Sequence, residues 1–165
     1  MSEDSPIPNR ISGFFEIIDD RGDAAVKGSL KCSCGCKSFS MHYFGKLGLK
    51  FFSPTIVATK HNGGKRVVLT AKCSECSKQI LVYDSSIDGY ENYDKLKREF
   101  IGEYHDFTCD SCGMNRMHLD IAYNSDGKKE LTRQNKTNWK ECFLEIFVSG
   151  KCASCNKVYK RFLEG

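Results

Sequence analysis

The stretch from residue 108 to residue 121, TCDSCGMNRMHLDI, carries the features that decide the fold of this chain. It contains Cys109 and Cys112, which are separated by two residues and followed at once by Gly113. From residue 117 to residue 121 apolar and polar side chains alternate, which is the pattern of a strand with one buried face. The stretch therefore predicts a tight cysteine loop that leads directly into a β-strand.

The same order of features occurs twice along the chain. Nine of the ten cysteines fall in four clusters, and Cys142 stands alone. The clusters are Cys32-Ser-Cys34-Gly-Cys36, Cys73-x-x-Cys76, Cys109-x-x-Cys112 and Cys152-x-x-Cys155. Strand-like segments flank them at residues 39–43, 67–71, 80–83, 117–121, 143–148 and 158–159. Each half thus has the order cysteine pair, strand, excursion, strand, cysteine pair, strand, which indicates an internal repeat.

The surroundings of the cysteines favour metal binding over disulfides. The first nine residues are polar and acidic, and no apolar run approaches the length of about 20 residues that a membrane span needs. We therefore expect a cytoplasmic protein without membrane contacts, in which thiols stay reduced and closely spaced cysteines act as metal ligands. Secretion would reverse this expectation. The formal net charge of +4 neither requires nor excludes a nucleic-acid partner.

Four thiolates suit a tetrahedral zinc ion. A short Cys-x-x-Cys loop places two thiolates on one side of the ion, and a second loop completes the site. Gly35 and Gly113 follow the second cysteine of their loops, where a turn needs positive φ. A site of this kind has no open coordination position, which predicts a structural role. Metal binding would then supply much of the folding free energy.

These paired loops and strands resemble the zinc-ribbon family, and the resemblance covers both halves, from about Leu30 to Phe162. The double arrangement is similar to that of uncharacterised bacterial two-ribbon proteins. The first cluster departs from the pattern because a single residue separates Cys32 from Cys34, although a similar Cys-x-Cys-Gly loop occurs in the zinc tail of the bacterial preprotein translocase ATPase. Aligned on the glycines, the two predicted zinc sites are Cys32, Cys34, Cys73 and Cys76, and Cys109, Cys112, Cys152 and Cys155.

Several alternatives to this assignment stay open. Cys34 could pair with Cys36 in place of Cys32. The first and third clusters could share one ion, which would interleave the sites. Iron could occupy the same four thiolates and make an electron carrier.

The segment from residue 45 to residue 72 is the main lead to a ligand, because it is basic and contains no acidic residue. Basic side chains attract phosphates and aromatic rings stack on unpaired bases. The candidate nucleic-acid contacts are Lys46, Lys50, Phe51, Lys60, Lys65 and Arg66. The plainer alternative is a solvated basic hairpin whose Phe51 and Phe52 pack on the core.

The sequence therefore predicts a mainly β protein with two tandem zinc-ribbon-like modules. The expected parts are an acidic segment at 1–25 with an edge strand near residues 11–18, a first module at 26–84, an acidic connector at 85–106 and a second module at 107–165. A short helix is expected at residues 90–100.

The predicted function is that of a non-catalytic binding or adaptor protein with two zinc ions and a protein partner. Nucleic-acid binding and a thiol/zinc redox switch that uses Cys36 are the alternatives. The sequence shows no arrangement of a catalytic triad and no phosphate-binding glycine loop. We therefore expect neither an enzyme nor a small-molecule substrate.

Overall fold

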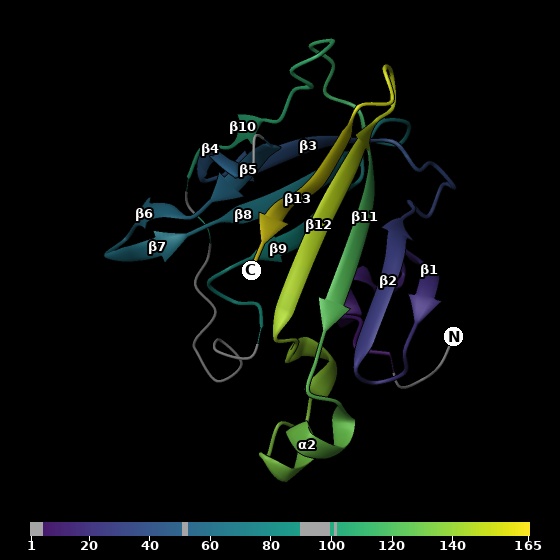
Figure 1. The fold of residues 1–165 in the computed structure, drawn as a ribbon, viewed down its shortest axis with the longest axis vertical. Coiled ribbons are helices and arrows are strands. Elements are labelled where there is room, and N and C mark those ends of the chain that lie inside the picture. Colours follow the sequence, from purple (N-terminus) through teal and green to yellow (C-terminus); the bar gives the residue numbers. More distant parts are fainter. Residues whose placement is uncertain (1–4, 51–52, 90–99, 101) are drawn as a thin grey trace.

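The computed structural model describes residues 5–50, 53–89, 100 and 102–165. The protein is mainly β, as predicted, with 48% of the described residues in strands and 9% in helices. The helical elements are α1 (Asn9–Ser12), α2 (Lys128–Arg133) and the 3-10 helix η2 (Trp139–Glu141). The strands are β1 (Phe15–Asp20), β2 (Ala25–Leu30), β3 (Phe39–Phe44), β4 (Lys46–Lys50), β5 (Ser53–Val57), β6 (Thr59–His61), β7 (Gly64–Arg66), β8 (Val68–Cys73), β9 (Gln79–Asp84), β10 (His105–Asp106), β11 (Met117–Asn124), β12 (Glu145–Cys152) and β13 (Val158–Glu164) (Figure 1).

The internal repeat is visible in the strand pairing. Strands β3, β8 and β9 form an antiparallel unit in the first half, and β11, β12 and β13 form the matching unit in the second. Phe39, the first residue of β3, lies opposite Cys73, and Met117, the first residue of β11, lies opposite Cys152. This register brings the loop before each unit alongside the loop between its second and third strands.

The two halves share one sheet. One edge of β11 pairs with β12, and its other edge pairs with β2, from Asp120 opposite Ser29 to Asn124 opposite Ala25. At its start β11 also pairs with β3, where Met117 lies opposite Phe39. These two residues occupy equivalent places in the repeat, so the halves meet at matching positions. The resulting strand order is β1-β2-β11-β3-β8-β9, with β12 and β13 on the other side of β11 (Figure 1).

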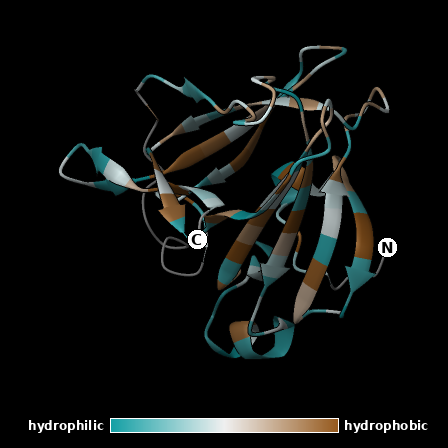
Figure 2. Ribbon diagram, turned by 45° about the horizontal axis from the view of Figure 1, so that its top comes forward, coloured by the Kyte–Doolittle hydropathy of each residue, from teal (hydrophilic) through white to brown (hydrophobic). Residues whose placement is uncertain are grey.

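A single large hydrophobic cluster contains side chains from both halves. Phe39, Met41 and Leu69 from the first half and Ile121 and Phe162 from the second are all completely buried within it. Alternate residues of β3 and β11 face this core, which confirms the period-two prediction for both segments. Figure 2 shows the apolar stretches along these strands. The cysteine loops at the ends of these strands are therefore supported by one core that both halves share.

The excursions between the strands differ in the two halves. The first half contains the hairpins β4–β5 and β6–β7, whereas the second contains α2 and η2. In the second excursion Leu131, Trp139 and Cys142 form a small separate apolar cluster. Cys142, the one cysteine outside the four sequence clusters, is thus a completely buried apolar residue. Within the described parts of the chain, no helix is long and apolar enough to cross a bilayer.

The N-terminal segment differs in detail from the prediction. The expected strand at residues 11–18 begins only at Phe15, because the chain first forms the helical turn α1 after Pro8. That turn places Ile11 completely inside the core. Strand β1 is an edge strand, and it pairs with β2. The predicted helix at residues 90–100 lies outside the described residues except for Phe100.

Candidate metal centres

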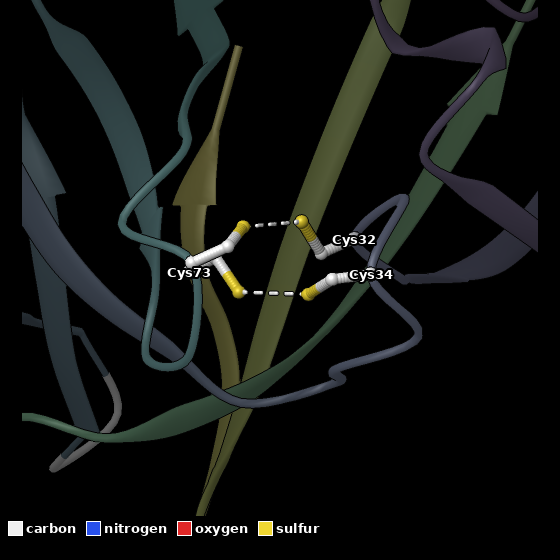
Figure 3. Close-up of side chains that lie close together, drawn as sticks. Cys32, Cys34 and Cys73 are labelled. Atoms are coloured by element: carbon white, nitrogen blue, oxygen red, sulfur yellow. Dashed lines mark hydrogen bonds between the residues drawn. The ribbon is translucent and has the colours of Figure 1, made fainter.

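The structure brings eight cysteines together in two groups of four. These are Cys32, Cys34, Cys73 and Cys76, and Cys109, Cys112, Cys152 and Cys155. Within each group all four sulfur atoms lie within 4.8 Å of one another. In the first group Cys34 and Cys73 face each other across the two loops, with the sulfur of Cys32 beside them (Figure 3).

The sulfur separations fit a bound ion and not a disulfide. Two sulfur pairs are 3.4 and 3.6 Å apart in the first group, and two are 3.5 and 3.6 Å apart in the second. A disulfide would require about 2.05 Å. Four sulfurs at about 2.3 Å from a tetrahedral zinc ion are about 3.8 Å from one another. Each group could therefore close around one metal ion with little movement.

The three Cys-x-x-Cys loops are built in the same way. In each loop the N–H of the first cysteine donates to a carbonyl five residues on, and the residue after the second cysteine donates back to the first cysteine's carbonyl. The first bonds are Cys73 to Lys78, Cys109 to Met114 and Cys152 to Lys157, at 2.9, 2.9 and 2.8 Å. The return bonds come from Ser77, Gly113 and Asn156, each of which has positive φ. The turn therefore requires a left-handed residue directly after the second cysteine.

The first loop is a version of this turn that is one residue shorter. The N–H of Cys32 donates to the carbonyl of Cys36, and the N–H of Gly35 returns to Cys32, both at 2.8 Å. Gly35 has a φ of 90°, so the predicted positive φ is confirmed here and at Gly113. Cys36 thus closes the loop with its backbone, while its sulfur contacts the N–H and carbonyl of Ser38 at 3.4 Å. The sulfur groups contain neither Cys36 nor an interleaved combination of clusters.

The first cysteine of every loop is buried and the second is exposed. Burial raises the pKa of the Cys73 thiol, but hydrogen bonds from the N–H groups of Cys76 and Glu75 outweigh it and lower the pKa to about 6. Cys109 also has a pKa lowered to about 6, because hydrogen bonds from Tyr159 and from backbone N–H groups outweigh its burial. These thiols therefore tend toward the thiolate form that metal ions require.

Tyr159 makes the two groups unequal. Its hydroxyl lies 3.1 Å from the sulfur of Cys109, contacts the carboxylate of Asp110 and accepts the N–H of Asp110 at 3.1 Å. The same place in the first half, four residues after the second cysteine of the loop, is held by the buried Ile80, which has no hydrogen-bonding group. Sequence reasoning missed this contact, because a tyrosine in a strand carries no sign of the sulfur it will face.

Tyr159→Phe should therefore weaken metal binding at the second group alone. Removing a hydrogen-bonding partner of a metal ligand typically lowers affinity by about 10-fold or more, while phenylalanine keeps the buried ring. The effect can be measured by chelator competition and by cadmium NMR of the cadmium-loaded protein, which reports on the two sites separately. Tyr43→Phe, in a strand of the other half, is the matched control. If Tyr159→Phe left the metal affinity of the second group unchanged, or lowered the affinities of both groups equally, the expectation would be contradicted.

The candidate nucleic-acid contacts are scattered. Lys46 and Lys50 are exposed on β4, and Lys60 and Lys65 lie opposite each other in the exposed β6–β7 hairpin. Phe51 and Phe52 lie outside the described residues. Arg66 must be corrected, because its side chain is only 4% exposed and both Nε and Nη2 donate to the buried carboxylate of Asp84. The last residue of β7 faces the core, so the Arg66 guanidinium is held in a buried ion pair and is not available to contact a nucleic acid at the surface.

Four thiolates on one tetrahedral ion would leave no position for water or substrate, so an ion held by either group would have a closed coordination shell. Comparisons of the chain with protein-family models, with curated proteins and with solved structures found no match.

Proposed function

We propose that this chain is a non-catalytic zinc-binding protein in which two structural sites hold a β scaffold that binds another macromolecule. The observation that carries this proposal is the pair of four-cysteine groups with sulfur atoms at nearly tetrahedral spacing. Zinc fits because it favours four thiolates in a closed tetrahedron and has no redox chemistry. The closed ligand set supports a scaffold over an enzyme.

The position of the two groups supports a role in folding. Each group joins a loop that precedes one strand to a loop that connects two others, as the pairs Phe39–Cys73 and Met117–Cys152 show. Backbone bonds reinforce the junctions at equivalent places, from Ser74 to Ser38 at 3.1 Å and from Ala153 to Arg116 at 2.9 Å. A metal ion in each group would fix both junctions and so stabilise the common core.

A protein partner is supported by the β4–β5 hairpin. Leu47 and Leu49 are 47% and 79% exposed and share one face of this hairpin, because they alternate along β4. Exposed apolar side chains that gather on one surface commonly mark a contact with another protein. The β6–β7 hairpin, with Lys60 and Lys65 side by side, supports nucleic-acid binding as the second candidate function.

Native mass spectrometry of protein purified without added metal tests the metal part of the proposal. We expect two zinc ions per chain, both lost on denaturation in acid because protons displace the metal from the thiolates. One ion per chain, or a coloured protein that contains iron, would contradict two structural zinc sites. The Cys36→Ser variant is the control, because its sulfur belongs to neither group and the metal content should not change.

A further inference from the structure

A basic groove of about 510 Å³ lies between β5 of the first half and β13 of the second. Four cations line it, and a single carboxylate, that of Glu164, lies among them. The cations are Lys50, Lys157, Lys160 and Arg161. Only Lys50 belongs to the basic segment that the sequence singled out, so this surface arises from the packing of the two halves.

A β-bulge places two of these cations side by side. The pairing of β12 with β13 shifts register between Val148 and Gly150, and the N–H of Arg161 donates to the hydroxyl of Ser149 at 3.0 Å. Arg161 has a φ of 48°, a left-handed conformation that is costly for a residue with a long side chain. As a result Lys160 and Arg161 are both exposed, although consecutive strand residues normally face opposite sides. Bulges and left-handed residues of this kind are common at binding sites.

The groove already accommodates a carboxylate. Glu164 lies between Lys50, with which it forms an ion pair, and the guanidinium of Arg161 at 3.7 Å. Arg161 also stacks over the ring of Phe147 at 4.5 Å, which orients the planar guanidinium and leaves its edge open to acceptors. Among the described residues, Lys160 is exposed and has no ion-pair partner. The groove can therefore receive further negative groups.

We propose that this groove binds an acidic peptide segment of a protein partner. Carboxylates of the peptide pair with Lys160 and Arg161, whereas Lys157 is already paired with Asp110 at 2.7 Å. The peptide backbone lies along β13, which pairs only with β12 in the described parts of the chain. An unpaired strand edge offers N–H and carbonyl groups that match a peptide backbone. This inference rests on the proposed binding function and names the class of its partner.

The groove wall favours a peptide over a nucleic acid. Among the described residues, Tyr159 is the aromatic side chain of the lining; it is 1% exposed and its hydroxyl is engaged at Cys109, so it offers no open face on which a base could stack. Arg161 occupies one face of the neighbouring half-buried Phe147 ring. Val158 is 55% exposed and, with Pro54, gives the groove an aliphatic wall that suits apolar side chains between acidic ones.

Fluorescence anisotropy can test the proposal with two probes. The first is a short labelled peptide of alternating glutamate and valine, and the second is labelled oligothymidine. We expect the peptide to bind, and the double variant Lys160→Glu/Arg161→Glu to weaken it by at least about 10-fold, since both charges now repel it. Lys27→Glu/Lys129→Glu changes the net charge equally at exposed positions away from the groove, and should alter binding by less than about 3-fold. The milder Lys160→Ala/Arg161→Ala variant repeats the test with a smaller perturbation of the fold.

Three results would overturn the proposal. These are peptide binding that the groove variants leave unchanged, no peptide binding at all, and tighter binding of oligothymidine that the same variants abolish. The last result would make the groove a nucleic-acid surface. Zinc content measured on the same samples separates this proposal from the one above. If the protein contains two zinc ions but does not bind the peptide, only the groove proposal is refuted. If it binds the peptide but contains no zinc, only the proposal of structural zinc sites is refuted.

Discussion

Cys152→Ser should lower the midpoint of thermal unfolding by at least about 10 °C. The free energy of zinc binding to a four-ligand structural site is about 10–16 kcal/mol in small zinc modules. At this chain length a loss of about 1 kcal/mol lowers the midpoint by about 2–4 °C, so even part of that free energy produces a large shift. Cys152 is completely buried at the end of β12, opposite Met117. Circular dichroism would follow the midpoint.

The shared core makes this effect larger than a local one. Met117 and Leu119 from β11 lie in the same cluster as Phe39 and Met41 from β3, so opening the second metal loop exposes side chains that pack against the first half. We therefore expect one transition for the whole chain, not separate melting of two halves. Cys36 is half-buried against the core but belongs to neither sulfur group, so Cys36→Ser should lower the midpoint by only about 2–4 °C. A midpoint of Cys152→Ser equal to that of Cys36→Ser would show that the second sulfur group carries no structural metal.

The second large effect is expected at the buried ion pair between Arg66 and Asp84. Arg66→Met should destabilise the protein by about 3–5 kcal/mol, because it leaves the carboxylate of Asp84 buried without its cation. The side chains are 4% and 3% exposed. Asp84 also accepts hydrogen bonds from the N–H and hydroxyl of Ser86 at 3.0 and 2.9 Å. Urea unfolding followed by fluorescence would measure the change.

The network around Asp84 explains why the loss should be global. The N–H of Asp84 donates to Asp88 at 2.6 Å, and Asp88 in turn accepts from Arg10 Nη2 at 2.6 Å. Arg10 belongs to α1 and also donates to the carbonyls of Leu81 and Val82 in β9. The ion pair thus lies in a chain of contacts that ties β7 and the N-terminal turn to β9.

Two variants separate this explanation from a surface role for Arg66. Arg66→Met/Asp84→Leu removes both charges together and should recover part of the lost stability, because no buried charge remains, although Ser86 loses its acceptor. Lys60→Ala/Lys65→Ala removes the two exposed lysines of the same hairpin and should change stability by less than about 0.5 kcal/mol. If Arg66→Met were as stable as this lysine variant, the buried pair would contribute nothing. A test of nucleic-acid binding should accordingly change Lys60 and Lys65 and leave Arg66 intact.

The sequence by itself determined the cysteine loops and the strands that adjoin them. A Cys-x-x-Cys turn is closed by hydrogen bonds that span at most five residues, as between Cys109 and Met114, so its residues suffice to specify it. The positive φ of Gly35 and Gly113 follows from the same local geometry. Alternation in β3 and β11 specified which side chains face a core, because the strand period is set by the backbone. The repeat of both features was enough to predict a mainly β fold with two groups of cysteines.

Only the tertiary structure decided how these parts meet. Nothing in β2 indicates that it pairs with β11, since any amphipathic strand could fill that edge and the choice depends on the packing of the whole core. The same holds for Arg66 and Asp84, for Tyr159 and Cys109, and for the basic groove between β5 and β13. In each case the partners are distant in sequence, and the contact forms because burial of the shared core brings them together. Residues close together in the sequence determine local hydrogen bonds and the alternation of side chains along a strand. Long-range contacts depend on the free energy of the complete fold.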